Sequence, residues 1–318
     1  MQEQYRHVYI ASCDPQGGIA HYHMDSSGKL YPVDMTPMEN PKYMVISDGK
    51  MYIVLGGLEG SHLSVYELDE NGMLGARLSY DSTQGTEACH LLVNGDTVYC
   101  ANYFSGSIIK MPDRLIRHIG KGVHPTRQDM AHAHYVGLTP DGKYVLAVDL
   151  GVDTVFQYDQ DLRLVAKTKI PDGHGPRHLA FSDDGKTCFV VNELISSVTV
   201  CSYKNERLTV QDTVSTLPDG YTDVSYGSAI RCCGDKVYAS NRGHNSIAVM
   251  GFADKKLTLE ALLDCGGDFP RDFDLIDDIL VCTNQKSDDV CVLRKNASGS
   301  YSLADKACLK TPICVVFA

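Results

Sequence analysis

The stretch YVLAVD (144–149) decides the fold, because close variants of it recur along the 318-residue chain. Each copy is a short run rich in apolar and aromatic residues. The seven copies are HVYIAS (7–12), KMYIVLG (50–56), TVYCAN (97–102), YVLAVD (144–149), CFVVNE (188–193), VYASNR (237–242) and LVCTNQ (280–285). Neighbouring copies are 43 to 49 residues apart. A period in the forties, with strands on both sides of each copy, is typical of β-propeller blades.

The segments around the copies support this interpretation. Most copies follow a tight turn such as SDGK (47–50), PDGK (140–143) or DDGK (183–186), whose Asp-Gly pairs supply the positive φ that hairpins need. A third strand such as SVTVCSY (197–203) comes after the copy. We therefore predict an all-β fold, a seven-bladed β-propeller with four antiparallel strands per blade, that uses residues 1–318 as a single domain. The chain has no tryptophan, which argues against the WD-type propellers.

The two ends of the chain are expected to complete one blade together. The first copy lacks an innermost strand before it, whereas PICVVF (312–317) at the C-terminus resembles innermost strands such as PKYMVI (41–46) and RHLAF (177–181). We predict that the C-terminal strand joins the first blade and closes the ring. Closure removes the exposed sheet edges that invite aggregation.

The charge of the chain limits its partners. A net charge of −11 and a pI near 5.5 repel phosphate backbones and anionic lipid, so we expect no nucleic-acid partner and no membrane partner. A small anionic substrate would have to meet a local cluster of basic side chains. The N-terminal residues MQEQYRHVYIAS lack the apolar stretch of a signal peptide. These features predict a cytoplasmic protein, a monomer or weak homodimer.

The twelve cysteines do not form a recognisable framework. Several of them, such as Cys100, Cys188 and Cys282, lie in apolar strands, where cysteine behaves as a small hydrophobe. There is no Cys-x-x-Cys pair and no Cys/His ligand spacing, so the sequence predicts reduced thiols, no zinc site and no cofactor.

Propeller geometry places the polar residues of the seven repeats on one rim. The first two strands of a blade are antiparallel, so the start of the first strand and the end of the second lie on the same face. The candidate functional residues at these positions are His90, His132, His134, Arg177, Glu193, Arg242, Arg271 and Lys286. Asn102, Asn192, Asn241 and Asn284 recur at the strand ends of several blades, which indicates a structural role in turns.

These residue types fit metal-free attack of water on an activated ester. Glu193 could act as general base or acid and share that work with His132 or His134, which strand alternation places on the same side. Arg177 and Arg242 could stabilise an oxyanion or clamp an anionic group. By the same alternation, His178 should point away from Arg177. No Gly-x-Ser-x-Gly elbow, Walker loop or dinucleotide fingerprint occurs in the chain.

The sequence also resembles a known family across essentially the whole chain. The segments that carry the resemblance are AHAHYVGLTPDGKYVLAVDLGVDTVFQY (131–158), GHGPRHLAFSDDGKTCFVVNELISSVTVCSY (173–203), YASNRGHNSIAV (238–249), PRDFDL (270–275) and CTNQKSDDVCV (282–292). They are similar to the lactonase family of seven-bladed propellers, which includes propeller-type 6-phosphogluconolactonases and fungal carboxymuconate-lactonising enzymes. One departure is Ala131, where the family usually has proline before the first histidine.

The resemblance implies a set of roles. The family's His-x-His motif corresponds to His132 and His134, its arginine and glutamate motifs to Arg177 and Glu193, and these four are the expected catalytic residues. Arg242 corresponds to a second arginine motif and is expected to bind substrate. We assign substrate binding also to three further residues on the predicted rim, Arg271, Lys286 and His90.

Three functions stay open at this stage. The first is hydrolysis of an anionic sugar lactone, above all 6-phosphogluconolactone in the pentose phosphate pathway. The second is a cycloisomerase acting on a muconate-type diacid with the same groups. The third is a propeller that binds a ligand without turnover, because a fold does not dictate a function.

Overall fold

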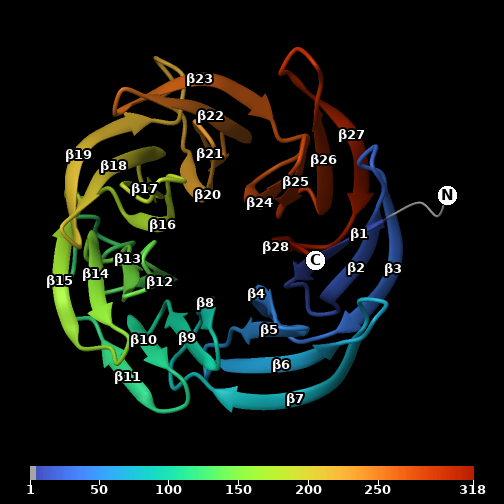
Figure 1. The fold of residues 1–318 in the computed structure, drawn as a ribbon, viewed down its shortest axis with the longest axis horizontal. Coiled ribbons are helices and arrows are strands. Elements are labelled where there is room, and N and C mark those ends of the chain that lie inside the picture. The colour runs from blue at the N-terminus through green and yellow to red at the C-terminus, as the bar shows by residue number, and fades with distance from the viewer. Residues whose placement is uncertain (1–4) are drawn as a thin grey trace.

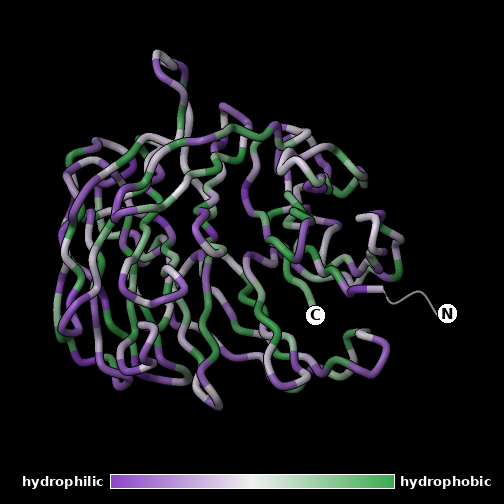
Figure 2. The backbone as a smooth tube through the Cα atoms, turned by 45° about the horizontal axis from the view of Figure 1, so that its top comes forward, coloured by the Kyte–Doolittle hydropathy of each residue, from purple (hydrophilic) through white to green (hydrophobic). Residues whose placement is uncertain are grey.

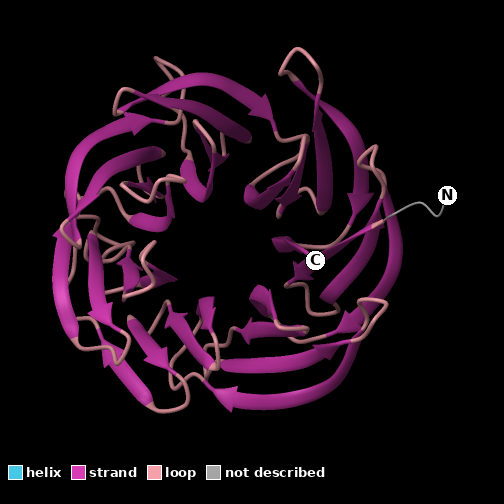
Figure 3. Cartoon of the chain, viewed as in Figure 1, coloured by secondary structure: helices cyan, strands magenta, loops and turns pink. Residues whose placement is uncertain are grey.

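Seven four-stranded sheets surround a central axis in the computed structural model, which describes residues 5–318 (Figures 1 and 3). The paired strands within each sheet are antiparallel. The predicted seven-bladed β-propeller with four antiparallel strands per blade is therefore confirmed. Every element in residues 5–318 is a strand, so this part of the chain has no helix that could cross a membrane.

The first four blades have the following strands, given from the axis outward. Blade 1 contains β28 (Pro312–Phe317), β1 (Arg6–Ser12), β2 (Gly18–Met24) and β3 (Leu30–Pro37). Blade 2 contains β4 (Pro41–Ser47), β5 (Lys50–Leu55), β6 (His62–Leu68) and β7 (Leu74–Ser82). Blade 3 contains β8 (Ala88–Asn94), β9 (Thr97–Asn102), β10 (Ser107–Lys110) and β11 (Arg114–Arg117). Blade 4 contains β12 (Ala133–Leu138), β13 (Tyr144–Asp149), β14 (Thr154–Asp159) and β15 (Leu164–Lys169).

The remaining three blades repeat this order. Blade 5 contains β16 (Pro176–Phe181), β17 (Thr187–Asn192), β18 (Ser197–Lys204) and β19 (Arg207–Ser215). Blade 6 contains β20 (Tyr226–Cys233), β21 (Lys236–Arg242), β22 (Ser246–Ala253) and β23 (Lys256–Asp264). Blade 7 contains β24 (Pro270–Ile276), β25 (Ile279–Asn284), β26 (Asp289–Lys295) and β27 (Tyr301–Cys308).

The C-terminal strand closes the ring as predicted. In blade 1, β28 occupies the innermost position and pairs with β1, so that Val315 lies opposite Ile10 and Phe317 opposite Val8. In Figure 1 the red C-terminal strand lies beside the blue β1. Two segments about 300 residues apart in the sequence thus share one sheet, and the innermost strands form a continuous wall around the axis.

The core consists of apolar clusters between neighbouring blades. The aromatic side chains of the repeated strand supply large members of these clusters: Tyr9, Tyr99 and Phe189 are all at most 1% exposed. Tyr9 and Tyr99 also donate hydrogen bonds to carbonyl groups of the next blade, Gly72 and Gln160, both at 2.7 Å. A buried phenol needs such a partner, so these residues fasten one blade to the next. Figure 2 shows hydrophobic residues recurring along the strands, with hydrophilic residues at many of the turns.

The recurring asparagines support the blade architecture. The side chain of Asn102 donates to the carbonyl of Thr83 at 3.1 Å and accepts from the Thr83 hydroxyl at 2.7 Å. Asn241 makes the same pair of bonds with Thr216, at 2.9 and 2.6 Å. Each pair ties the end of a second strand to the segment that leads into the same blade, which agrees with the predicted structural role.

A β-bulge near the start of the innermost strand recurs in all seven blades. Each register shift places one extra residue on the innermost strand, except in blade 6, where the irregular stretch between Gly227 and Ile230 is longer. In the other six blades the extra residues are Ile313, Lys42, Cys89, His134, Arg177 and Arg271. A bulge changes the direction in which a side chain points, and bulges are common next to active sites.

Candidate active site

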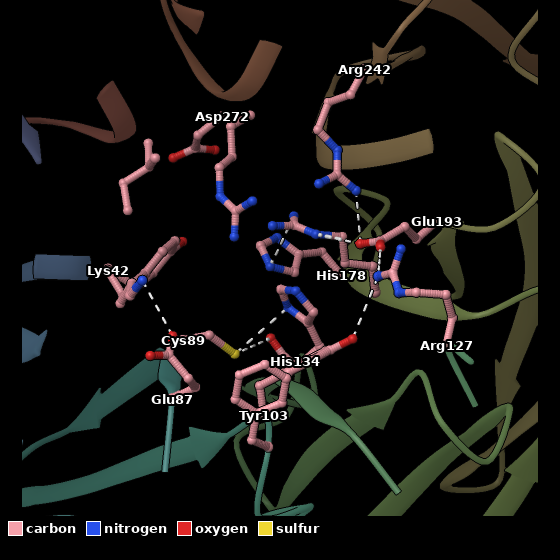
Figure 4. Close-up of a pocket in the computed structure, with 15 residues that line it drawn as sticks. Lys42, Glu87, Cys89, Tyr103, Arg127, His134, His178, Glu193, Arg242 and Asp272 are labelled. Atoms are coloured by element: carbon pink, nitrogen blue, oxygen red, sulfur yellow. Dashed lines mark hydrogen bonds and ion pairs between the residues drawn. The ribbon is translucent and has the colours of Figure 1, made fainter. Parts of the chain in front are cut away.

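A polar pocket of about 320 Å³ opens at the axis of the ring (Figure 4). Six of its lining residues are the six bulge residues just named. Three further lining residues directly follow a bulge residue: Tyr43, His178 and Asp272. The others come from the ends of second strands and from loops: Glu87, Tyr103, Phe104, Arg127, Glu193 and Arg242. Small-molecule sites have volumes of roughly 300–1,000 Å³, so the pocket suits a small metabolite. The repeated bulge thus directs one side chain from each of six blades to a common centre.

Glu193 lies at the centre of an arginine cluster, which we define as Arg127, Arg177 and Arg242. Its carboxylate is 2% exposed and forms an ion pair with each of the three. The Nη2 atom of Arg242 is 2.8 Å from Oε2, and the Nε atom of Arg177 is 3.3 Å from the same oxygen. Arg127 contacts Oε1 from the other side. One buried carboxylate therefore orients three guanidinium groups (Figure 4).

The cluster shifts the pKa values of its members in opposite directions. Burial alone would raise the pKa of Glu193, but Arg242, Arg127 and Arg177 together hold it well below its usual range. Burial and the charges of Arg242 and Arg271 lower the pKa of Arg177 to about 9. At neutral pH both groups stay charged. The surroundings stabilise the negative charge of Glu193 and destabilise the positive charge of Arg177.

The pocket carries an excess of positive charge. Five cationic side chains and three carboxylates line it, although the chain as a whole has a net charge of −11. Arg271 contacts the amide oxygen of Gln285 at 3.4 Å rather than a carboxylate. Within residues 5–318, the buried Nε atom of Arg242 has no hydrogen-bond partner, and that of Arg177 makes only the 3.3 Å ion-pair contact with Glu193. An unsatisfied buried donor together with excess positive charge favours an anionic ligand over a metal cation.

His134 and Cys89 lie together on the pocket wall. The thiol of Cys89 is 3.8 Å from Nδ1 of His134. Burial raises the pKa of Cys89 to about 12, so the group is a thiol and a weak nucleophile at neutral pH. Burial, with the charge of Arg177, holds the pKa of His134 well below its ordinary value. The imidazole of His134 is therefore neutral at neutral pH.

The structure brings five of the eight predicted site residues together. His134, Arg177, Glu193, Arg242 and Arg271 all line the pocket. They come from β12, β16, the end of β17, β21 and β24, so only the closed ring places them side by side.

His132 lies outside the residues that line the pocket. Its ring stacks on Tyr103 with centroids 4.5 Å apart, and its Nε2 atom is 3.3 Å from Asp129. The expectation that His132 and His134 face the same side assumed an uninterrupted strand. β12 begins at Ala133 and is bulged at His134, so the alternation does not extend back to His132.

His90 and Lys286 also lie outside the pocket lining, which corrects their predicted placement. The ring of His90 stacks between Tyr43 and Tyr135, with centroid distances of 4.1 and 4.3 Å. The bulge residue Cys89 takes the place in the pocket that we had predicted for His90. The ammonium group of Lys286 lies over the ring of Phe269, 4.0 Å from its centroid.

Sequence reasoning missed several residues of the pocket. Arg127 belongs to the loop between β11 and β12, where no strand position marks it. Lys42 and Glu87 form an ion pair at 3.2 Å on the wall across the pocket from Arg127 (Figure 4). His178 lines the pocket although we expected it to point away, because the bulge at Arg177 interrupts the alternation. A signal that could have found Lys42 is the Pro-x start of the strand, since Arg177, Arg271 and Ile313 also follow a proline.

The fold and the pocket together define a class of protein, a seven-bladed propeller with a cationic pocket at its axis. The chain belongs to the family described as "Lactonase, 7-bladed beta-propeller", whose model matches residues 7–317. The resemblance seen in the sequence is thereby confirmed.

Individual relatives cover nearly the whole chain. An uncharacterized protein of Staphylococcus aureus (strain USA300) is 29% identical over 97% of this chain and 99% of its own length. A solved structure of a protein from Lactobacillus plantarum has a TM-score of 0.92 at 29% identity, covering 99% of this chain and 100% of its own. A protein from Bacteroides fragilis, named as a candidate 6-phosphogluconolactonase, has a TM-score of 0.90 at 25% identity and covers 99% and 98% of the two chains.

Proposed function

We propose that the pocket hydrolyses an anionic sugar lactone, 6-phosphogluconolactone above all, to the open-chain acid. Family membership supports lactone chemistry, and the name of the Bacteroides fragilis relative supports this substrate. The observation that carries the proposal is the imbalance of the arginine cluster, in which one carboxylate faces three guanidinium groups. A phosphate or carboxylate on the substrate would supply the missing negative charge.

The arginines would act on the ester carbonyl. Water adds to the carbonyl carbon, the ring C–O bond breaks, and the departing ring oxygen takes up a proton, which gives a hydroxyl group and a carboxylate. Negative charge develops on the carbonyl oxygen during the addition. The buried Nε donor of Arg242 has no partner in residues 5–318, so it can bind that oxygen without breaking an existing hydrogen bond, and Arg177 pairs with the same Glu193 oxygen beside it.

We assign the activation of water to His134, with Glu193 as the group that positions the arginines and orients the water. A carboxylate whose pKa is held so low accepts a proton poorly at neutral pH. His134 is neutral, and the charge of Arg177 is one cause of its lowered pKa. The negative charge that develops on the carbonyl oxygen would offset the charge of Arg177, remove part of that effect and make His134 a stronger base during the addition.

Two variants distinguish the roles of the two histidines in the His-x-His motif, His132 and His134. His134→Gln should lower kcat by about 10²-fold, because it removes the proton acceptor from the pocket wall. His132→Gln should lower kcat by less than about tenfold, because His132 does not line the pocket and only stacks on Tyr103, which does. Steady-state lactonase assays of both purified variants measure the difference. A larger loss in His132→Gln than in His134→Gln would contradict the assignment.

The pH dependence offers an independent check on His134. Its lowered pKa means that the imidazole stays neutral as the pH falls through 6.5, where an ordinary histidine becomes charged. We therefore expect kcat/KM for the unphosphorylated gluconolactone, after subtraction of the spontaneous rate, to stay level between about pH 8 and 6; this substrate is chosen because a phosphate would itself titrate at about pH 6. A decline with a midpoint near 6.5 would show that an ordinary, unperturbed histidine is the base.

The substrate assignment is tested with freshly prepared lactones. Acid release from 6-phosphogluconolactone should exceed the spontaneous rate, and kcat/KM should be at least about tenfold higher than for the unphosphorylated gluconolactone, because a charge-assisted contact is worth roughly 1.5–3 kcal/mol. No excess rate on either lactone would remove the proposal. If both lactones are hydrolysed faster than they hydrolyse spontaneously, but at similar kcat/KM, the protein is a lactonase with a different preferred substrate. On this assignment the protein acts in the cytoplasm, in the pentose phosphate pathway.

A second candidate is a cycloisomerase that acts on a muconate-type diacid. The observation in its favour is that Lys42 lies on the pocket wall opposite Arg127 and Arg242, so cationic groups face the ligand from two sides (Figure 4). A diacid could use both. Turnover of a muconate, followed by its ultraviolet absorbance and compared with the lactones, distinguishes the two functions. Tight binding of either ligand without turnover would indicate a binding protein instead.

A further inference from the structure

Three histidines come together on blade 1, away from the pocket. His7 lies in β1, and His21 and His23 lie in β2 on the neighbouring strand. The antiparallel register pairs His7 with His23 and Tyr9 with His21, so the three imidazoles share one face of the sheet. His7 is near the start of β1, whereas the pocket residues Glu193 and Arg242 are at the ends of the equivalent strands. The histidine cluster, His7, His21 and His23, therefore lies toward the opposite face of the ring.

The spacing of the cluster is that of a metal site. Nδ1 of His7 is 2.8 Å from Nε2 of His21, and one ring nitrogen from each of the three residues lies within 4.8 Å of the others. The ring centroids are 5.0, 5.1 and 5.4 Å apart. Tetrahedral zinc with Zn–N bonds of about 2.1 Å separates its ligand nitrogens by about 3.4 Å and the ring centres by roughly 5 Å. The His7–His21 pair, now at 2.8 Å, would open by about 0.6 Å, and a pair at the 4.8 Å limit would close by about 1.4 Å, to bring the three nitrogens to these positions.

His21 faces the cluster with its Nε2 atom, and in the described part of the chain its other ring nitrogen is free to bind a ligand as well. His21 is 2% exposed, yet its Nδ1 atom has no hydrogen-bond partner among residues 5–318. Asp34 lies directly opposite His21 in the register of β2 and β3, which places a carboxylate beside the cluster. A divalent cation would be stabilised by this carboxylate.

We propose that His7, His21 and His23 form a binding site for a divalent transition metal of the zinc, cobalt or nickel type. Imidazole ligands suit these ions, and a site with three histidines leaves one position open for water. The metal would cross-link β1 and β2 in the blade that closes the ring, beside the contact of Tyr9 with Gly72 of blade 2. The sequence alone predicted no zinc site because the ligands come from two strands, without a local Cys/His motif.

Cobalt binding to the full-length, tag-free protein tests this site. Titration with Co²⁺ should give one equivalent of visible d–d absorption without the near-ultraviolet band of a thiolate ligand, and Zn²⁺ should displace the Co²⁺ and raise the thermal midpoint. His7→Gln and His23→Gln should each weaken binding by at least about tenfold. The control His62→Gln removes a histidine that stacks on Tyr80 in blade 2 and should bind as the wild type does.

Each result of the cobalt titration either supports or overturns metal binding by the three histidines. Absence of stoichiometric binding in the wild type would overturn the proposal, as would unchanged binding in both His7→Gln and His23→Gln. A thiolate absorption band would assign the metal to cysteine instead. His7 and His23 are both partly exposed, so the two variants should keep the fold, which the unfolding transition without metal verifies. Binding and thermal midpoints are read without any substrate, so the result does not depend on the lactonase proposal.

Discussion

Replacing Arg177 with methionine should lower kcat/KM for the lactone by about 10²–10³-fold, the loss expected when one donor to a developing oxyanion is removed. The same variant should keep the thermal midpoint of the wild type or raise it. The reason is the lowered pKa of Arg177, which means that the folded protein disfavours the charge on this side chain. Methionine fills similar space without that charge, while Arg127 and Arg242 still face Glu193.

Two measurements check this prediction, lactone hydrolysis and thermal unfolding of the same preparation. A matched variant is Arg231→Met, which also removes an arginine of an innermost strand, here with a partly exposed side chain. Arg231 pairs with Asp272 and Asp274 at 3.1 Å each, and these carboxylates raise its pKa. Its loss should lower the thermal midpoint, opposite to the effect at Arg177. If Arg177→Met unfolds at a clearly lower temperature, Arg177 is a structural ion-pair partner and the catalytic interpretation fails.

Replacing Glu193 with glutamine should damage both activity and stability. The amide cannot neutralise Arg127, Arg177 and Arg242, so three guanidinium groups would repel one another in a buried site. Breaking a buried ion pair by removing one partner costs about 3–5 kcal/mol, which urea unfolding would measure. The activity should fall by about 10²-fold or more, because the arginines lose their orientation. Unchanged activity in Glu193→Gln would remove Glu193 and its cluster from the mechanism.

The free energy of unfolding should depend on pH in the way expected for a carboxylate with a lowered pKa, Glu193. Its pKa in the folded state is lower than in the unfolded chain, where a glutamate titrates near 4.3. Its contribution to the free energy of unfolding is therefore complete above that value and is lost as the pH falls toward the folded-state pKa. The difference in stability between the wild type and Glu193→Gln should be constant from pH 7 to 5 and narrow below about pH 4. A difference that grows in acid would contradict this linkage.

The placement of a candidate residue in the pocket agreed with the sequence where its position depends on the end of a strand. Glu193 and Arg242 directly follow or end second strands, and this boundary can be read from the repeated sequence. The prediction was less accurate where it relied on strict alternation. His90 was assigned to the pocket and Cys89 was overlooked, and the direction of His178 was wrong. All three errors occur at or next to a bulge, where one extra residue changes which face a side chain takes.

Arg127 shows a different limit of sequence reasoning. It lies in the loop between β11 and β12, which has no repeat equivalent to align with. Its place beside Glu193 depends on contacts such as the bond from Nε2 of the neighbouring Gln128 to the carbonyl of Leu150 at 2.8 Å. This contact joins residues 22 positions apart, and no local pattern predicts it.

The sequence by itself determined the number of blades, the strands of each blade, the closure of the ring and the rim that carries the polar residues. These properties follow from a repeated local pattern, since alternation and turn residues act over a few positions. Only the tertiary structure decided which polar residues meet: the three arginines around Glu193, the bulged His134 instead of His132, and the cluster of His7, His21 and His23. The reason is that convergence depends on packing between strands that are distant in the chain, and one inserted residue in a strand is enough to redirect a side chain.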